Sequence, residues 1–122
     1  MTQPIYEING TGYIYLFGEL HGFESQQALS DVCGIANISK YPGDNPKFGF
    51  NIGEGSGMII NADGVFLITN GSKYHVGNNE TLAYYQLNGA QQPVTTAGGQ
   101  MCLDMLPAGE QILIPATAEA AK

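Results

Sequence analysis

The sequence contains no tryptophan and no arginine, and its few lysines are outnumbered by 11 acidic residues. The formal charge of −7 leaves no cluster of basic side chains for phosphate backbones, which argues against nucleic-acid binding. No apolar run approaches the ~20 residues of a membrane-spanning helix, and the first residues lack the basic and apolar pattern of an export signal. We therefore expect no membrane insertion and, from the chain as given, no export.

Residue types that carry catalysis are also scarce, with two histidines and two cysteines. Glu19 and His21 would share a strand face, and together with His75 they could form the carboxylate–imidazole metal site of a small cupin-like enzyme. The paired histidines typical of cupins are absent, so we expect exposed histidines in turns, no catalytic residue, no metal and no cofactor. Cys33 and Cys102 lack CxxC spacing, and without export two buried free thiols are favoured over a disulfide.

What the chain does contain is glycine, at 17 positions, with 43% hydrophobic and only 12% charged residues. Glycines spread along a chain of 122 residues suit many short strands joined by tight turns. We predict an all-β fold, an antiparallel β-sandwich over residues 1–114, with residues 115–122 as a tail. No linker and no clean internal repeat is visible in the sequence.

Three successive strand pairs are predicted between Gly57 and Ile114. The first turns through 61–64, where an Asp-Gly pair stands between apolar runs and favours a hairpin. The second pairs 82–87 with a weaker strand to Val94 through an Asn-Gly turn. The third pairs 100–106 with 111–114, and its face of Met101, Leu103 and Met105 is expected in the core.

The order DGVFLIT, LNGAQQP and GGQMCLDMLPAGEQILI resembles the C-terminal half of a C1q/TNF-like jelly roll, over residues 57–114. It is most similar to the compact variant found at the heads of bacterial and phage surface fibres. The resemblance implies a jelly-roll sandwich that assembles as a homotrimer. Family members add a last apolar strand after the position of Ile114, and here the N-terminal strand or a partner subunit would have to fill that place.

The N-terminal half gives weaker signals. Residues 23–32 fit one or two helical turns or a loop, 33–38 fit a short strand, and 48–52 fit another strand. The run from Tyr13 to Phe17 is apolar on both faces, which predicts either an ordinary core strand or a central strand at a subunit contact.

From these patterns we predict a set of contact residues. The expected subunit interface comprises Tyr13, Tyr15, Phe17, Tyr84 and Leu103, and the candidate ligand loops carry Tyr41 and Tyr74.

The function expected from the sequence is structural rather than enzymatic. We predict a decoration, cement or fibre-head protein on a phage virion surface, with its own copies and a capsid or fibre protein as partners. The alternative is a carbohydrate- or receptor-binding adhesin at a bacterial or phage surface or outside the cell, using exposed tyrosines in the loops. Fold alone does not separate the two, because function depends on sites rather than folds.

Overall fold

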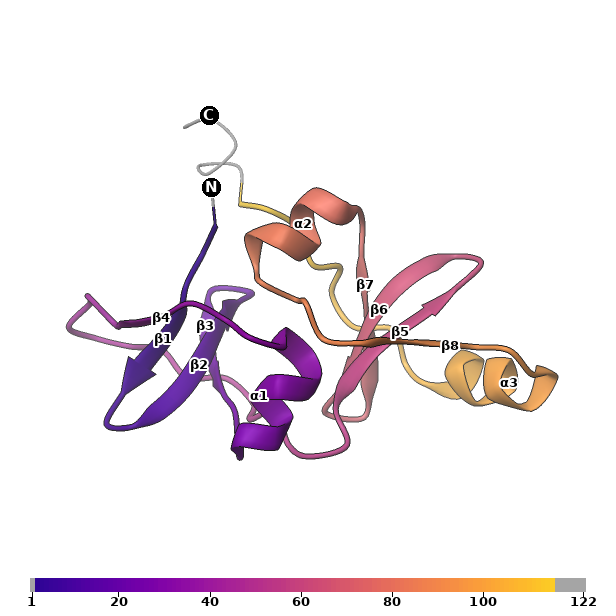
Figure 1. Cartoon of the computed structure of the whole chain (residues 1–122), viewed down its shortest axis with the longest axis horizontal. Coiled ribbons are helices and arrows are strands. Elements are labelled where there is room, and N and C mark those ends of the chain that lie inside the picture. Colours follow the sequence, from indigo (N-terminus) through magenta and orange to yellow (C-terminus); the bar gives the residue numbers. More distant parts are fainter. Residues whose placement is uncertain (1, 116–122) are drawn as a thin grey trace.

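The computed structural model describes residues 2–115 of the chain, so the predicted tail lies outside the described residues except for Pro115. Most of the regular structure is β (Figure 1). The strands are β1 (Ile5–Ile8), β2 (Thr11–Leu16), β3 (Glu19–Gly22), β4 (Ile38–Lys40), β5 (Gly57–Asn61), β6 (Gly64–Thr69), β7 (Ser72–Val76) and β8 (Gln91–Pro93). The helices are α1 (Gln26–Cys33), α2 (Asn79–Tyr84) and α3 (Ala97–Met105).

The strands form two four-stranded sheets, in the orders β3-β2-β1-β4 and β7-β6-β5-β8. Three strands of each sheet are antiparallel neighbours, but β4 runs parallel to β1 and β8 runs parallel to β5. Two mixed sheets with few helices are compatible with a β-sandwich. The prediction of purely antiparallel sheets is wrong for the outer pairs, because each fourth strand returns through a helix, as parallel pairing requires.

The two sheets are built by the same sequence of elements, three antiparallel strands, a helix and a parallel fourth strand. Residues at equivalent places in the two sheets are separated by the same number of positions along the chain, as Ile8 in β1 and Asn61 in β5 are. This spacing holds from the first strand of each sheet to the fourth. The hairpins between the second and third strands match in detail. In the hairpin of the first half φ is 56° at Phe17 and 76° at Gly18. In that of the second half it is 52° at Asn70 and 71° at Gly71, so both turns use the left-handed region. The chain thus contains an internal structural repeat, although no clean repeat is visible in its sequence.

The helices obey the same repeat. The Ser25 side chain caps α1 by accepting from the Ala28 N–H at 3.1 Å, and Asn78 at the equivalent position caps α2 by accepting from the Thr81 N–H at 2.8 Å. A short polar side chain at this position satisfies an N–H that has no partner within the helix. Each half therefore starts its helix at the same point after its third strand.

In each half a glycine packs closely against an aromatic ring. Segments 48–52 and 108–112 bridge in parallel to the outer edges of β3 and β7. Within them, a side chain at Gly49 would meet His21, and one at Gly109 would meet Tyr74, which is the residue equivalent to His21. Both positions need glycine because a ring occupies the space of a Cβ.

The halves differ after their fourth strands, where α3 is inserted in the second half only. The strand predicted at 100–106 is therefore wrong, because most of this segment belongs to α3. The strand predicted at 82–87 is also wrong, because residues 82–84 end α2 and a turn at 85–86 follows. Within the first of these segments Met101 and Met105 are exposed and only Leu103 is buried, so the predicted methionine core face is wrong.

Other local predictions fare better. The first hairpin is confirmed as β5 and β6, and its turn is closed by the Asp63 N–H donating to Asn61 Oδ1 at 2.8 Å. Of the two readings of 23–32, the helical one is correct. The strand predicted at 33–38 is wrong, since Cys33 ends α1 and only Ile38 begins β4.

One hydrophobic core joins the two halves, and α1 and α2 lie between the sheets in Figure 1. The end of α1 approaches the chain after α2 very closely, where the Gly89 N–H donates to Val32 O at 3.0 Å. No helix within residues 2–115 has the length and apolar character to cross a membrane.

Candidate functional site

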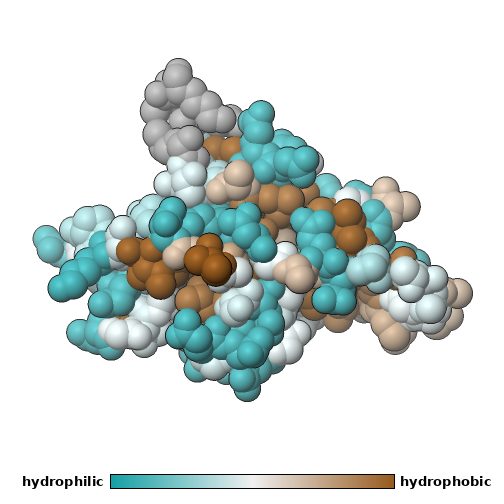
Figure 2. Space-filling view, in the orientation of Figure 1, coloured by the Kyte–Doolittle hydropathy of each residue, from teal (hydrophilic) through white to brown (hydrophobic). Residues whose placement is uncertain are grey.

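An apolar patch lies on the surface where α1 leads into β4. Gly34 ends the helix with φ 64°, a conformation that favours glycine, and its N–H donates to Ser30 O at 2.8 Å. The chain then leaves the helix with Ile35 99% exposed and Ile38 53% exposed. We call Ile35 and Ile38 the apolar patch. Figure 2 shows hydrophobic surface on this face of the molecule.

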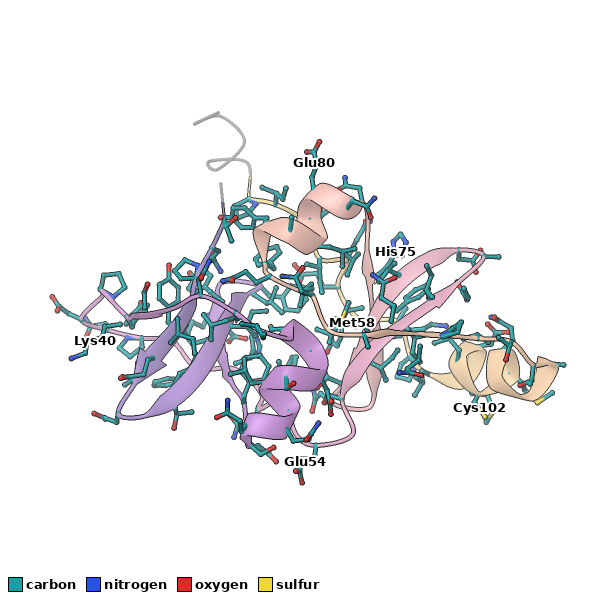
Figure 3. The ribbon with its side chains drawn as sticks, in the orientation of Figure 1. Lys40, Glu54, Met58, His75, Glu80 and Cys102 are labelled. Carbon is teal, nitrogen blue, oxygen red and sulfur yellow. The ribbon has the colours of Figure 1, made fainter. Side chains whose placement is uncertain are left out.

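A cleft of about 630 Å³ adjoins the apolar patch. Its lining includes Leu29 of α1, Ala36 of the following turn and Glu54 of the connector between the halves. Figure 3 shows the Glu54 side chain pointing away from the ribbon near the base of α1. Ile35 and Ile38 also line this cleft, whose surface combines these apolar side chains with polar ones such as Ser30 and Glu54.

The two parallel strands leave open sheet edges. All residues of β4 and of β8 are exposed, and within residues 2–115 no further strand pairs with either outer edge. Lys40 ends the first edge and Pro93 the second, two residue types that discourage uncontrolled edge pairing. Ile60, 37% exposed, lies beside Pro93 in the sheet.

The residues predicted at a subunit interface in β2 have one buried and one partly exposed face. Ile14 and Leu16 face the core, whereas Tyr13, Tyr15 and the adjoining Phe17 are half-buried. The expectation that this apolar run is buried on both faces is therefore wrong within the single chain, where one face is buried and the other half-buried. Whether its half-buried face contacts another subunit stays a prediction.

Two further predicted interface residues are buried in their own chain. Tyr84 is 7% exposed, with its ring centroid 4.8 Å from that of Tyr85, and Leu103 is 4% exposed. Both side chains are covered by contacts within the chain, so little of their surface is accessible to a partner.

The predicted ligand loops differ in their accessibility. Tyr41 does lie in a loop, where its half-buried ring meets Tyr6 edge-on at 5.4 Å between centroids. Tyr74 lies in strand β7 instead of a loop, and it stacks on Phe50 at 5.9 Å. Its placement in a ligand loop is wrong, because the third strand of the second half continues through it.

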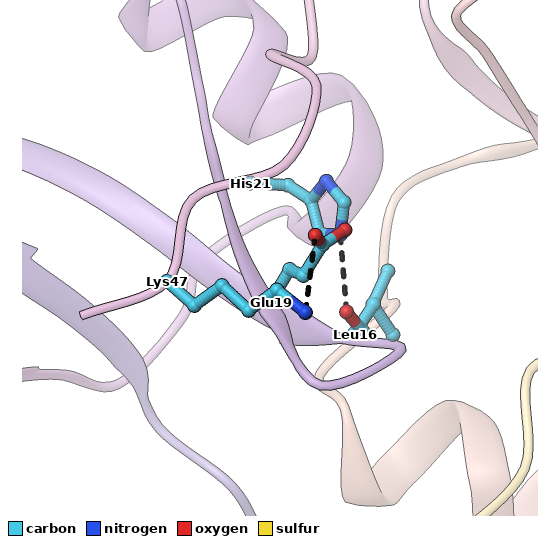
Figure 4. Close-up of polar contacts among 4 residues, drawn as sticks. All are labelled: Leu16, Glu19, His21 and Lys47. Carbon is cyan, nitrogen blue, oxygen red and sulfur yellow. Dashed lines mark hydrogen bonds and ion pairs between the residues drawn. The ribbon is translucent and has the colours of Figure 1, made fainter. Parts of the chain in front are cut away.

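The first histidine is fully buried, contrary to the expectation of an exposed turn residue. His21 Nδ1 lies 2.9 Å from Phe50 O and Nε2 lies 3.0 Å from Leu16 O. Its neighbour Glu19 approaches Lys47 at 3.9 Å, as Figure 4 shows. Each ring nitrogen thus faces a backbone carbonyl oxygen inside the protein, and the ring offers no nitrogen to a ligand at the surface.

His75 lies half-buried in β7, with Gln111 Nε2 at 3.3 Å from its Nδ1. Within the described residues, no three histidine, cysteine or carboxylate side chains are grouped closely enough to hold a metal ion. The geometry therefore does not bring together the cupin-like set of Glu19, His21 and His75.

Both cysteines are free, but the expectation that both are buried is wrong for Cys102, which lies on the exposed side of α3. This difference gives a direct test. Cys33 is buried, and burial raises its pKa from 9.0 to about 12, whereas Cys102 is exposed and points away from α3 in Figure 3. Because the thiolate is the reactive form, we expect about one thiol per folded chain to react with an aromatic disulfide reagent at pH 8. Cys102→Ser should abolish this reaction until the chain is unfolded, and a second fast thiol in the folded wild type would contradict the burial of Cys33.

No family model, no curated protein and no solved structure matches the chain.

The apolar patch was missed by the sequence analysis. Ile35 and Ile38 were included in a short strand, where isoleucines are usually buried. The available signal was Gly34, which follows a helix-compatible run and marks a helix end at which the chain turns outward.

Proposed function

We propose that the chain is a non-enzymatic structural protein that assembles with copies of itself through the apolar patch. A single exposed isoleucine is common on protein surfaces, but Ile35 and Ile38 line the same cleft, next to Leu29 and Ala36. Covering them removes hydrophobic surface from water, at about 25 cal/mol for each Å². This exposed pair is the observation that carries the proposal.

The open edges suggest how copies meet. The edge of β4 carries the apolar patch, and the edge of β8 offers Pro93 beside the exposed Ile60. Because the two surfaces are unlike, a contact between β4 of one copy and β8 of the next is heterologous and can close into a ring. Lys40 and Pro93 disfavour extension of the sheets, so side chains would make the contact.

A homotrimer is the ring size implied by the C1q/TNF-like resemblance, and we retain it as part of the proposal. Of the segments that carry the resemblance, the first hairpin, β5 and β6, is a strand pair in the structure, whereas 100–106 lies mostly in α3. The setting on a phage virion or fibre also derives from that resemblance. In this setting the acidic chain, with a net charge of −7, would form the solvent-facing exterior of a ring attached to a capsid or fibre protein.

The proposal predicts the solution mass of the chain. Light scattering should give a mass near three times 13.0 kDa, and the double variant Ile35→Ser/Ile38→Lys should give a monomer, because it places a charge in the apolar contact. The matched control is Met101→Ser/Met105→Lys, which makes the same two kinds of replacement at exposed apolar side chains of α3 and should leave the mass unchanged.

A monomeric wild type at every concentration would refute self-assembly. A wild-type oligomer that survives the double variant would show that another surface makes the contact. Co-sedimentation with particles tests the virion setting separately.

A further inference from the structure

The internal repeat creates two equivalent junctions between a helix and the opposite half. Helix α1 of the first half lies against β5, and α2 of the second half lies against the segment that enters β1. Equivalent residues keep the spacing defined above, so the two junctions can be compared position by position. The α2 junction is filled by side chains, and we call it the closed junction. The α1 junction contains a cleft, and we call it the open junction.

The closed junction is filled by side chains of the chain itself. The Gln3 N–H donates to Tyr84 O at 2.7 Å, and the Gln3 side chain donates from Nε2 to Tyr15 O at 2.9 Å. The Tyr84 hydroxyl lies 3.5 Å from Gln3 Oε1. Tyr6 adjoins this cluster, since burial and then the neighbouring Tyr84, Tyr41 and Tyr15 raise its pKa. Phenol rings and one amide thus occupy this junction.

The open junction is a cleft of about 620 Å³, in the size range of small-molecule sites. Its residues are smaller than their counterparts: Asp31 stands in place of Tyr84, Ser56 of Gln3, Ile59 of Tyr6 and Ile68 of Tyr15. Met58, labelled in Figure 3 between α1 and β8, contributes to its wall. The space that rings fill in one half is vacant in the other.

We infer that this cleft binds a small molecule with a phenol-like ring and a cationic or hydrogen-bond-donating group. Ile59 and Ile68 supply an apolar wall for a ring, since Tyr6 and Tyr15 hold rings at the equivalent positions of the closed junction. Ser56 and Gln92 add polar groups at the rim.

The charge at the cleft selects among such ligands. Asp31 places a carboxylate in it, with Oδ1 accepting from Gln27 Nε2 at 2.8 Å. A carboxylate favours an ammonium or hydroxyl donor, and the net charge of −7 disfavours anions. A phenol with an amine therefore fits better than a phenol with a carboxylate. The cleft includes Gln92 of β8, whose edge takes part in the proposed contact, but neither Ile35 nor Ile38. Ligand binding that the Ile35→Ser/Ile38→Lys variant retains would therefore be independent of the proposed assembly.

Tyramine and 4-ethylphenol are suitable probes, because both carry the phenol and only tyramine carries an ammonium. In heteronuclear NMR titrations of the full chain, amide shifts should cluster at residues 30–31, 55–59 and 68. Tyramine should bind about two- to fivefold more tightly, and Asp31→Asn should remove this difference. Scattered shifts, or none up to millimolar probe, would overturn the inference.

Filling the cleft gives the second arm of the test. The triple variant Asp31→Tyr/Ser56→Gln/Ile59→Tyr copies the closed junction and should weaken binding of both probes at least tenfold. Gln26→Tyr adds a ring on the exposed side of α1 outside the cleft and should leave binding unchanged. If the triple variant fails to fold, Ile59→Tyr alone serves. Undiminished binding by a folded filled variant would place the ligand elsewhere.

Discussion

Replacement of Gly89 by alanine is expected to unfold the chain, or to lower its unfolding free energy by at least ~3 kcal/mol. A Cβ at this position would collide with the Asp31 carbonyl oxygen and would lie 2.7 Å from the Asp31 carbonyl carbon and 2.8 Å from Val32 O. These are backbone atoms at the end of α1, which cannot rotate away as a flexible side chain can. Urea unfolding followed by circular dichroism measures the loss.

Gly98→Ala is the matched control. Gly98 lies in α3 with nothing within 4 Å of an added Cβ, so alanine should be neutral or stabilise by up to about 1 kcal/mol through its higher helix propensity. Equal stability of the Gly89 and Gly98 variants would mean that the two halves do not approach each other at Gly89.

The same residue explains why part of the fold was mispredicted. Asn88-Gly89 after a run of leucine and tyrosine has the local pattern of a β-hairpin turn, and strand propensity supported it. In the structure Gly89 is required by a contact with α1, which is distant in the sequence. The competing signal was Asn78, which caps α2, and such a cap can outweigh the β preference of the residues that follow.

The first hairpin was predictable because its information is local. Asn61 and Asp63 close the turn through a hydrogen bond between neighbours, and Gly64 supplies a φ of 128°. In α3, by contrast, alternating Met101, Leu103 and Met105 suggested a strand. Only Leu103 became buried, and the Thr96 cap, which accepts from the Gly99 N–H at 2.9 Å, set the helix.

The internal repeat could not be seen in the sequence because it is conserved in backbone geometry more than in side chains. His21 corresponds to Tyr74, and Phe17 to Asn70, pairs with little chemical similarity. What recurs is glycine where the backbone requires it, at Gly18 and Gly71 in the turns. The open cleft could not be predicted from the sequence for the same reason. That a smaller side chain, Asp31, stands where the other half has Tyr84 is seen only when the two halves are aligned by their backbones.

The stability of the chain is expected to fall steeply in alkaline solution. Burial raises the pKa of Cys33 from 9.0 to about 12, and burial together with Tyr84 and Tyr15 raises the pKa of Tyr85 from 10.0 to about 12. Below pH 9 the thiol is protonated in both states. Above pH 9 the unfolded chain loses this proton while the folded chain keeps it, so unfolding becomes more favourable up to about pH 12.

The thiol alone should lower the unfolding free energy by about 4 kcal/mol across this window, since each pH unit contributes about 1.4 kcal/mol. Urea unfolding between pH 8 and 11 measures the slope. Cys33→Ala should start less stable, because it leaves a small cavity, but should lose less stability above pH 9. Cys102→Ser is the control and should follow the wild-type slope. Parallel curves for wild type and Cys33→Ala would contradict the buried thiol, since the remaining alkaline loss would then arise from tyrosines such as Tyr85.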